Sequence, residues 1–396
     1  MAGSPTTRLA DAARMPAVLR RPALVLAFAT LVLACGASPR AQDALVVRSE
    51  KHDFRVARLV EGLEHPWALA FLPDGRLLIT ERPGRLRIVR EGKLEPRPVE
   101  GLPAIAAYGQ GGLLDVALHP RYEDTGWVYL AYSAPGPGGA STEVLRGKLR
   151  GHRLEDAEVI FRMQPKTDAA QHFGCRLVFD RLGFLYVTLG DRGERDAAQR
   201  LEDHRGTIVR LHDDGRVPAD NPFRGRPGAR PEIFTYGNRN VQGAALHPVT
   251  GVLWAHEHGP QGGDEVNVIR AGTNYGWPVI TYGRNYGTGT RIGEGTHKPG
   301  MAQPIHVWVP SIAPSGMAFY TGDRFPAWRG SLLVGALADQ MLVRLELDGE
   351  KVLREERLLK GTLGRIRDVR SGPDGLVYLL SDASKGVLVR LEPVPR

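Results

Sequence analysis

Residues 177–191, LVFDRLGFLYVTLGD, consist of two short apolar strands joined by a polar turn. The same pattern occurs five more times, at 68–82, 116–133, 244–259, 318–337 and 369–382. A third strand follows each copy, and another short apolar run, such as 56–60 or 232–236, lies between one copy and the next. Short strands with turns such as Pro-Asp-Gly predict antiparallel hairpins. Six four-stranded units, each too small to bury a core alone, predict an all-β, six-bladed β-propeller of four-stranded antiparallel blades.

The repeat defines the domain organisation. No linker or charge run interrupts it, so we expect a single propeller domain over 46–396. Residues 1–45 lie outside the repeat and resemble an export leader, because two arginines precede an apolar run at 23–34 that is short for a membrane span. Cleavage there would give a periplasmic or secreted protein. The alternative is a lipoprotein site that leaves a lipid anchor on Cys35.

Charge and cysteine content exclude some classes of function. The formal net charge of +8 comes from arginines scattered along the chain, without the basic stripe or tail that is typical of nucleic-acid binding. We therefore expect no nucleic-acid partner. Cys175 is the one cysteine outside the leader, and its apolar neighbours favour a buried side chain rather than a nucleophile.

The propeller fold predicts where a binding site lies. Each link from the outer strand of one blade to the inner strand of the next crosses the same face near the central channel, so equivalent links surround one mouth of that channel. These links contain Gln110, His172, Arg239, Asn240, Arg365 and Arg367. His119 and His247 instead precede prolines at the ends of first strands, on the opposite face, where we expect turn residues.

His172 is the candidate general base. Asp191 ends the second strand of the unit that His172 introduces, so both residues are expected at one end of the same blade. A carboxylate on one imidazole nitrogen leaves the other nitrogen free to accept a proton. The alternative is that Asp191 only caps the turn that follows the strand.

The three arginines of the mouth predict an anionic ligand, because guanidinium groups pair with carboxylates or phosphates. An ion pair with Asp368 is the alternative for one of them. Residues 256–265 combine glycines, a proline and carboxylates, which favours calcium over zinc.

Several motifs together resemble one family. They are residues 109–117 (GQGGLLDVA), His172 with Gly-x-Arg-Leu after it, 237–243 (GNRNVQG), 258–267 (HGPQGGDEVN), 274–278 (NYGWP) and 365–369 (RIRDV). The chain is similar in these motifs to the soluble pyrroloquinoline-quinone (PQQ) dependent aldose sugar dehydrogenases, of the glucose/sorbosone dehydrogenase type. The similarity extends from about Leu59 to Leu391.

The resemblance implies a cofactor and a metal. PQQ has three carboxylates and would lie over the channel mouth. The residues implied to contact it are Gln110, Arg239, Asn240, Tyr286, Arg365 and Arg367. The carbonyls of Gly259 and Pro260 are implied to hold a catalytic calcium, and Glu265 and Tyr275 match positions that bind a further, structural calcium.

The resemblance also implies a reaction. His172 would remove the proton of the anomeric hydroxyl of an aldose while the C1 hydride passes to PQQ, with Arg239 stabilising negative charge on the quinone. The sugar would leave as a lactone, and an external electron acceptor would reoxidise the cofactor. Two other classes remain open at this stage: a calcium-dependent propeller lactonase or other hydrolase, and a non-catalytic binding propeller.

The chain differs from the family pattern at two positions. Ala338 stands where family members commonly have Lys, and Gln171 stands where some have an acid. The first difference removes one cation that would contact PQQ.

Overall fold

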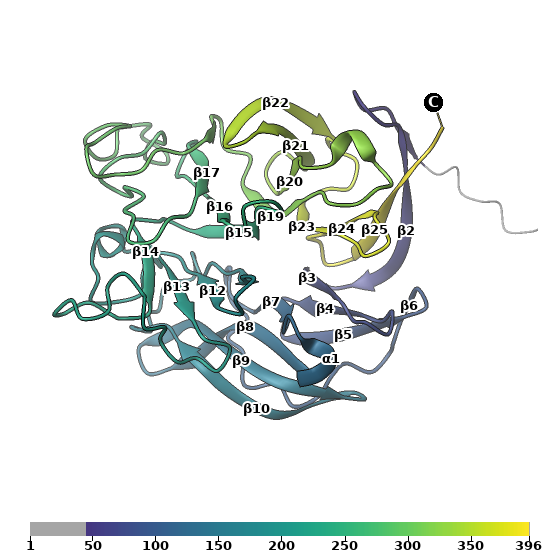
Figure 1. Ribbon diagram of the computed structural model, residues 1–396, viewed down its shortest axis with the longest axis horizontal. Helices are drawn as coiled ribbons and strands as arrows, with labels where there is room; N and C mark the ends of the chain where they lie inside the picture. The colour runs from purple at the N-terminus through teal and green to yellow at the C-terminus, as the bar shows by residue number, and fades with distance from the viewer. Residues whose placement is uncertain (1–44, 396) are drawn as a thin grey trace, which may run out of the picture. The chain divides into compact units, whose positions relative to one another are not determined.

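The six predicted blades surround a central axis in the computed structural model, which describes residues 45–395 (Figure 1). The first three blades are β3 (Pro66–Phe71) to β6 (Lys93–Leu94), β7 (Leu113–Leu118) to β10 (Arg153–Arg162), and β11 (Leu177–Phe179) to β14 (Ile233–Tyr236). The fourth and fifth are β15 (Val241–Leu246) to β18 (His306–Trp308) and β19 (Pro314–Phe319) to β22 (Lys351–Leu358). All strand pairs within the blades are antiparallel, so the predicted fold class is confirmed.

The sixth blade joins the two ends of the described chain. Its strands β23 (Ile366–Ser371), β24 (Val377–Ser381) and β25 (Gly386–Pro393) come from the last repeat, and β2 (Phe54–Leu63) pairs with β25 as the outer strand. The apolar run at 56–60 therefore completes the last blade and not the first. A two-residue strand, β1 (Val46–Val47), adds a fifth strand at the outer edge.

The interior strands of the blades are β4 (Leu77–Glu81), β5 (Arg85–Arg90), β8 (Trp127–Gly136), β9 (Gly139–Arg150), β12 (Leu185–Thr188), β13 (Thr207–Leu211), β16 (Leu253–Glu257), β17 (Asp264–Val268), β20 (Leu332–Ala336) and β21 (Met341–Asp348). Between residues 45 and 395, helical structure is limited to α1 (Tyr122–Thr125) and two short 3-10 segments, Arg195–Gln199 and Pro326–Trp328. Strands with both faces covered by neighbouring blades are buried throughout, which explains their continuous apolar runs.

Side-chain hydroxyls connect neighbouring blades close to the axis. Thr80 donates to the Leu114 carbonyl, Thr188 to the Val241 carbonyl and Ser315 to the Ile366 carbonyl. Each bond satisfies a backbone acceptor on the inner strand of the next blade, so the inner strands are held in a fixed register.

A buried ionic cluster fills the centre of the ring. Arg176 lies 3.1 Å from Asp115 and 3.0 Å from Asp368, and its guanidinium stacks over the Trp67 ring. Arg370 contacts the same two carboxylates from the other side. Each carboxylate also accepts a backbone N–H of the next blade, so both acids of this buried cluster contact arginines and a backbone donor.

The leader and the lipid-anchor alternative at Cys35 lie outside the described residues. Among residues 45–395 no helix is long and apolar enough to cross a membrane. Cys175 is buried, and burial raises the pKa of its thiol, which agrees with the expected packing role.

Candidate active site

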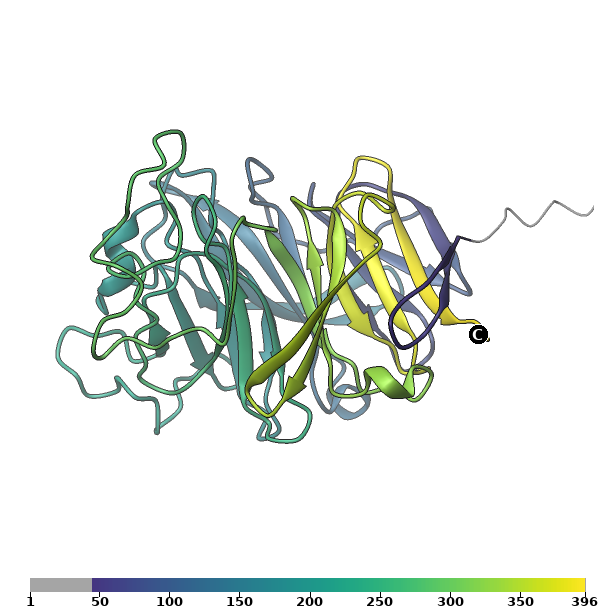
Figure 2. The same cartoon turned by 90° about the horizontal axis from the view of Figure 1, so that it is seen from above.

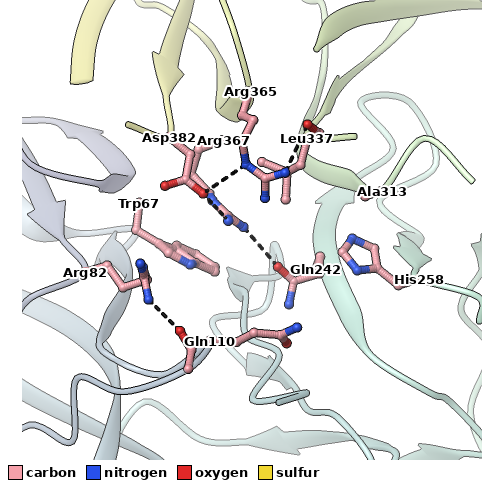
Figure 3. Close-up of a pocket in the computed structure, with 11 residues that line it drawn as sticks. Trp67, Arg82, Gln110, Gln242, His258, Ala313, Leu337, Arg365, Arg367 and Asp382 are labelled. Carbon is pink, nitrogen blue, oxygen red and sulfur yellow. Dashed lines mark hydrogen bonds and ion pairs between the residues drawn. The ribbon is translucent and has the colours of Figure 1, made fainter. Parts of the chain in front are cut away.

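The predicted links converge at one mouth of the channel. A cavity of about 290 Å³ lies there, and its walls come from blades one, four, five and six and from three of the interblade links (Figure 3). Its lining residues are Trp67, Arg82, Gly109, Gln110, Gln242, His258, Ala313, Leu337, Arg365, Arg367 and Asp382. Figure 2, which views the ring edge-on, shows the loops that connect the strands gathered at the two faces.

Three kinds of position in the repeat form most of this wall. Gln110 and Arg365 come from the interblade links, as the sequence predicts, whereas Trp67, Gln242 and Arg367 are the second residues of the inner strands β3, β15 and β23. The third kind is the residue directly after a second strand, and it contributes Arg82, His258, Leu337 and Asp382. The sequence analysis assigned a role to none of these four.

The charge of the cavity is positive. Arg367 forms an ion pair with Asp382 at 2.6 Å, and Arg365 lies 3.8 Å from the same carboxylate. Burial would raise the pKa of Asp382, but Arg367 and His65 outweigh it and hold that pKa below its usual value. Asp368, the partner considered from the sequence, instead binds Arg176 and Arg370 in the central cluster, so that expectation was wrong.

His172 and Asp191 form the predicted pair. The imidazole Nδ1 lies 2.6 Å from the Asp191 carboxylate, which is fully buried. Burial lowers the pKa of His172, and the contact with Asp191 offsets only part of this effect. Burial acts to raise the pKa of Asp191, but hydrogen bonds from His172 and Gly193 leave it below its usual value. At neutral pH the pair is therefore a neutral imidazole that donates Nδ1–H to a carboxylate.

This pair faces a second cavity of about 270 Å³ beside the first. Its lining residues are Gln171, His172, Asp191, Gly193, Arg195, Arg239, Trp277 and Tyr286. The Gln110 side chain connects the two cavities, because its carbonyl oxygen accepts the His172 backbone N–H at 2.8 Å. The Trp277 indole donates to Asp191 at 2.8 Å, so the long insertion contributes directly to the orientation of the base.

The buried Arg192 side chain supports the loop that carries His172. Arg192 is buried, donates to the carbonyls of Ala169 and Gln171, and lies over the Phe173 ring. His172 itself has a left-handed φ of 57°. A Cβ at Gly190 would lie 2.1 Å from the His172 carbonyl, so only glycine permits this approach. Asn240, also predicted from the links, is buried beneath the mouth, where its side-chain oxygen accepts the Gly174 N–H.

The predicted calcium carbonyls accept hydrogen bonds from two residues that line the second cavity. Arg239 donates to the Gly259 carbonyl at 2.8 Å, and the Tyr286 hydroxyl donates to the Pro260 carbonyl at 2.9 Å. Asp264 accepts the Gly259 N–H and fixes this turn. Each carbonyl has a second lone pair, so both remain available as hard oxygen ligands.

A small cavity of about 10 Å³ lies behind this turn, and its walls include Glu257, Glu265 and Tyr275. The two glutamates are directly opposite each other on β16 and β17. Burial raises the pKa of both carboxyls, and for Glu265 the charge of Glu257 adds to the effect. The Tyr275 hydroxyl already bonds Val268 and Arg270, so any ligation by Tyr275 falls to its backbone carbonyl.

Comparison with known proteins decides the family. Residues 63–390 match the family described as glucose/sorbosone dehydrogenase. The chain belongs to the glucose/sorbosone dehydrogenase family. The aldose sugar dehydrogenase YliI of Escherichia coli (strain K12) is 46% identical over 341 residues, which cover 85% of this chain and 92% of that protein.

Solved structures of similar proteins agree with the glucose/sorbosone dehydrogenase assignment. A crystal structure of a glucose dehydrogenase has 52% identity and a TM-score of 0.83, over 85% of this chain and 98% of that one. The PQQ-bound aldose sugar dehydrogenase of Streptomyces coelicolor has 28% identity and a TM-score of 0.70, over 85% of this chain and 96% of that one. The family membership confirms the predicted oxidoreductase class over the hydrolase and binding-protein alternatives.

The two histidines expected to be turn residues, His119 and His247, bond to nearby backbone N–H groups. His119 Nδ1 accepts the Arg121 N–H, and His247 Nδ1 accepts the backbone N–H groups of Val249 and Thr250. Both imidazoles therefore cap turns, as the position of each in the repeat predicts.

Proposed function

We propose that this protein oxidises the C1 hydroxyl of an aldose to the lactone with PQQ as its cofactor. The observation that supports this most is the juxtaposition of a cationic cavity with the His172–Asp191 pair, linked by Gln110. A ligand with several carboxylates fits the first feature, and removal of a hydroxyl proton fits the second. The match to aldose sugar dehydrogenases supports the substrate class.

The residues that would hold PQQ are Gln110, Arg239, Tyr286, Arg365 and Arg367, all of which line the two cavities. Asn240 would act from beneath, through the loop that it supports. When bound, PQQ supplies a two-electron acceptor for the C1 hydride, and an external acceptor later takes the electrons.

His172 performs the proton transfer in this proposal. Its Nδ1 is bound to Asp191, and Nε2 has no hydrogen-bond partner among the described residues of the chain. The Nε2 lone pair can therefore accept the proton of the C1 hydroxyl. Arg239, which lies over the Trp277 ring, places a positive charge where negative charge develops during oxidation.

The pH dependence of sugar oxidation should show the depressed pKa of His172. The base works only as neutral imidazole, so kcat/KM should fall as the pH drops through its pKa. Because that pKa lies below the ordinary 6.5, the acid limb is expected below pH 6.5. The charged and titratable groups around the imidazole are Asp191, Arg192, Arg195, Arg239 and Tyr286. An acid limb above pH 6.5 in steady-state rates would contradict this assignment.

We also propose that calcium occupies the sites predicted around β16 and β17. The observation that favours a cation is the pair of facing glutamates, Glu257 and Glu265. Asn238 and Asn267 donate to these carboxylates through their amide nitrogens, while their amide oxygens have no partner in the described chain. Facing carboxylates with free amide oxygens form a donor set of the kind that calcium prefers.

Removal of calcium should therefore destabilise the protein. Saturating Ca²⁺ at about a hundredfold excess over Kd contributes roughly 3 kcal/mol, so EDTA should lower Tm by several degrees in differential scanning calorimetry. The double variant Glu257→Gln/Glu265→Gln should lose most of this response. Glu232→Gln, at a carboxylate bonded to His204 in another blade, should keep it. An unchanged response in the double variant would place the metal elsewhere.

The direct test of the function is reconstitution. Apo-protein with PQQ and Ca²⁺ should reduce a redox dye in the presence of aldoses, whereas a hydrolase would release product without any acceptor. Dye reduction that depends on both sugar and PQQ supports the proposal. Sugar-independent reduction, or none in a protein that binds PQQ, contradicts it.

A further inference from the structure

Among the three arginines that line the 290 Å³ cavity, Arg82 is the one without a carboxylate partner. Arg82 directly follows β4 and lines the same cavity as Arg365 and Arg367. Those two arginines share Asp382. Within residues 45–395, no Asp or Glu lies within ion-pair distance of the Arg82 guanidinium, which donates only to the Gly109 carbonyl. Its charge is therefore not neutralised by the protein.

The backbone holds Arg82 firmly in place. Its N–H donates to the His65 carbonyl at 2.9 Å, and its own carbonyl accepts the Leu113 N–H at 3.1 Å. The packing is so close that a Cβ at Gly112 would lie 2.0 Å from the Arg82 carbonyl oxygen. The bond to Gly109 then fixes the guanidinium at 2.6 Å, on the side of the cavity with Trp67 and Gln110 (Figure 3).

The charge of the cavity depends on this residue. Its lining holds three arginines and one aspartate, a balance of +2, and without Arg82 the balance would be +1. In blade five the corresponding residue is Leu337, followed by Ala338, so among the lining residues Arg82 is the one cation that follows a second strand.

We infer that Arg82 binds a carboxylate of the anionic ligand in this cavity. Guanidinium groups hold carboxylates through charge-assisted hydrogen bonds, and a prepositioned donor loses little entropy on binding. The inference rests on the proposed function for the identity of the ligand, an aromatic polycarboxylate. Among the residues that follow second strands, the cation is then Arg82 on blade one. On blade five the residues after the second strand, Leu337 and Ala338, are apolar.

Titration calorimetry with two probes tests this inference. PQQ and benzene-1,3,5-tricarboxylate, which has carboxylates but no quinone, are titrated into the apo wild type, Arg82→Gln, Arg82→Lys and Arg76→Gln. We expect Arg82→Gln to weaken binding of both probes about tenfold or more and Arg82→Lys to weaken it less. Arg76→Gln, at an arginine paired with Asp74 in the turn between β3 and β4, should bind as the wild type does. The difference should shrink in high salt.

The variant Arg82→Gln is chosen because it removes the charge and keeps a polar side chain that can donate a hydrogen bond. Wild-type affinity of Arg82→Gln for both probes would overturn the inference. If the wild type binds the tricarboxylate but not PQQ, the proposed function fails and the comparison with Arg82→Gln still decides the role of Arg82. If the wild type binds neither probe, both proposals fail.

Discussion

The variant His172→Ala is expected to lose about 10²–10⁴-fold in kcat for aldose oxidation. The His172 imidazole lines the second cavity together with Arg239, and its Nε2 has no hydrogen-bond partner among residues 45–395. The backbone N–H of residue 172, not its side chain, bonds Gln110, so binding of PQQ should be largely retained. Stopped-flow reduction of the bound cofactor measures the chemical step directly.

A matched histidine provides the control for this experiment. His247 caps a turn on the opposite face through its Nδ1, and His247→Asn keeps an acceptor at that position. Its activity should equal that of the wild type. Sugar oxidation by His172→Ala at a rate close to the wild type would exclude His172 as the base.

The variant Asp191→Asn is expected to lower kcat by about 10²–10⁴-fold, because it changes which imidazole nitrogen holds the proton. One carboxylate oxygen accepts from both His172 and Gly193, and the other accepts from the Trp277 indole. An asparagine must direct its NH₂ group at one of these donors. The imidazole tautomer with its proton on Nδ1 and a free lone pair on Nε2 is then no longer stabilised by a carboxylate. Both the value of kcat and its pH profile should therefore change.

The control for this variant is another histidine–aspartate contact. Asp213 lies 3.6 Å from His119 on the opposite face, and Asp213→Asn should leave both kcat and the pH profile unchanged. A purely structural role for Asp191 would lower the amount of folded protein without moving the pH profile. That result, with normal kcat per folded molecule, would argue against an orienting role.

The sequence predicts the fold because the repeat is local. Each unit is a set of adjacent strands, so the turns and the alternation of Leu177–Phe179 and its equivalents specify antiparallel blades without any distant information. The closure of the ring by β2 was not predicted. Its pairing with β25 joins the two ends of the described chain, and no local pattern specifies such a distant partner.

The site was predicted as far as its residues lie in equivalent links. Gln110, His172, Arg239, Arg365 and Arg367 line the cavities because the propeller brings every link, and the start of the strand that follows it, to the same mouth. The role of Trp277 could not be predicted, because the path of a long insertion does not follow from a repeat. Asp382 could have been found, since it ends the sixth stretch as Asp191 ends the third.

The strand β2 closes the ring by pairing with β25 inside blade six, and this has a consequence for how the protein folds. Blade six cannot form until its last strands have been synthesised, so a growing chain has β2 without a partner, and β25 gains its outer neighbour only at the end. Such distant pairing slows folding and leaves strand edges free to associate with other chains. A chain that stops before β23 should therefore aggregate rather than form a smaller ring of five blades.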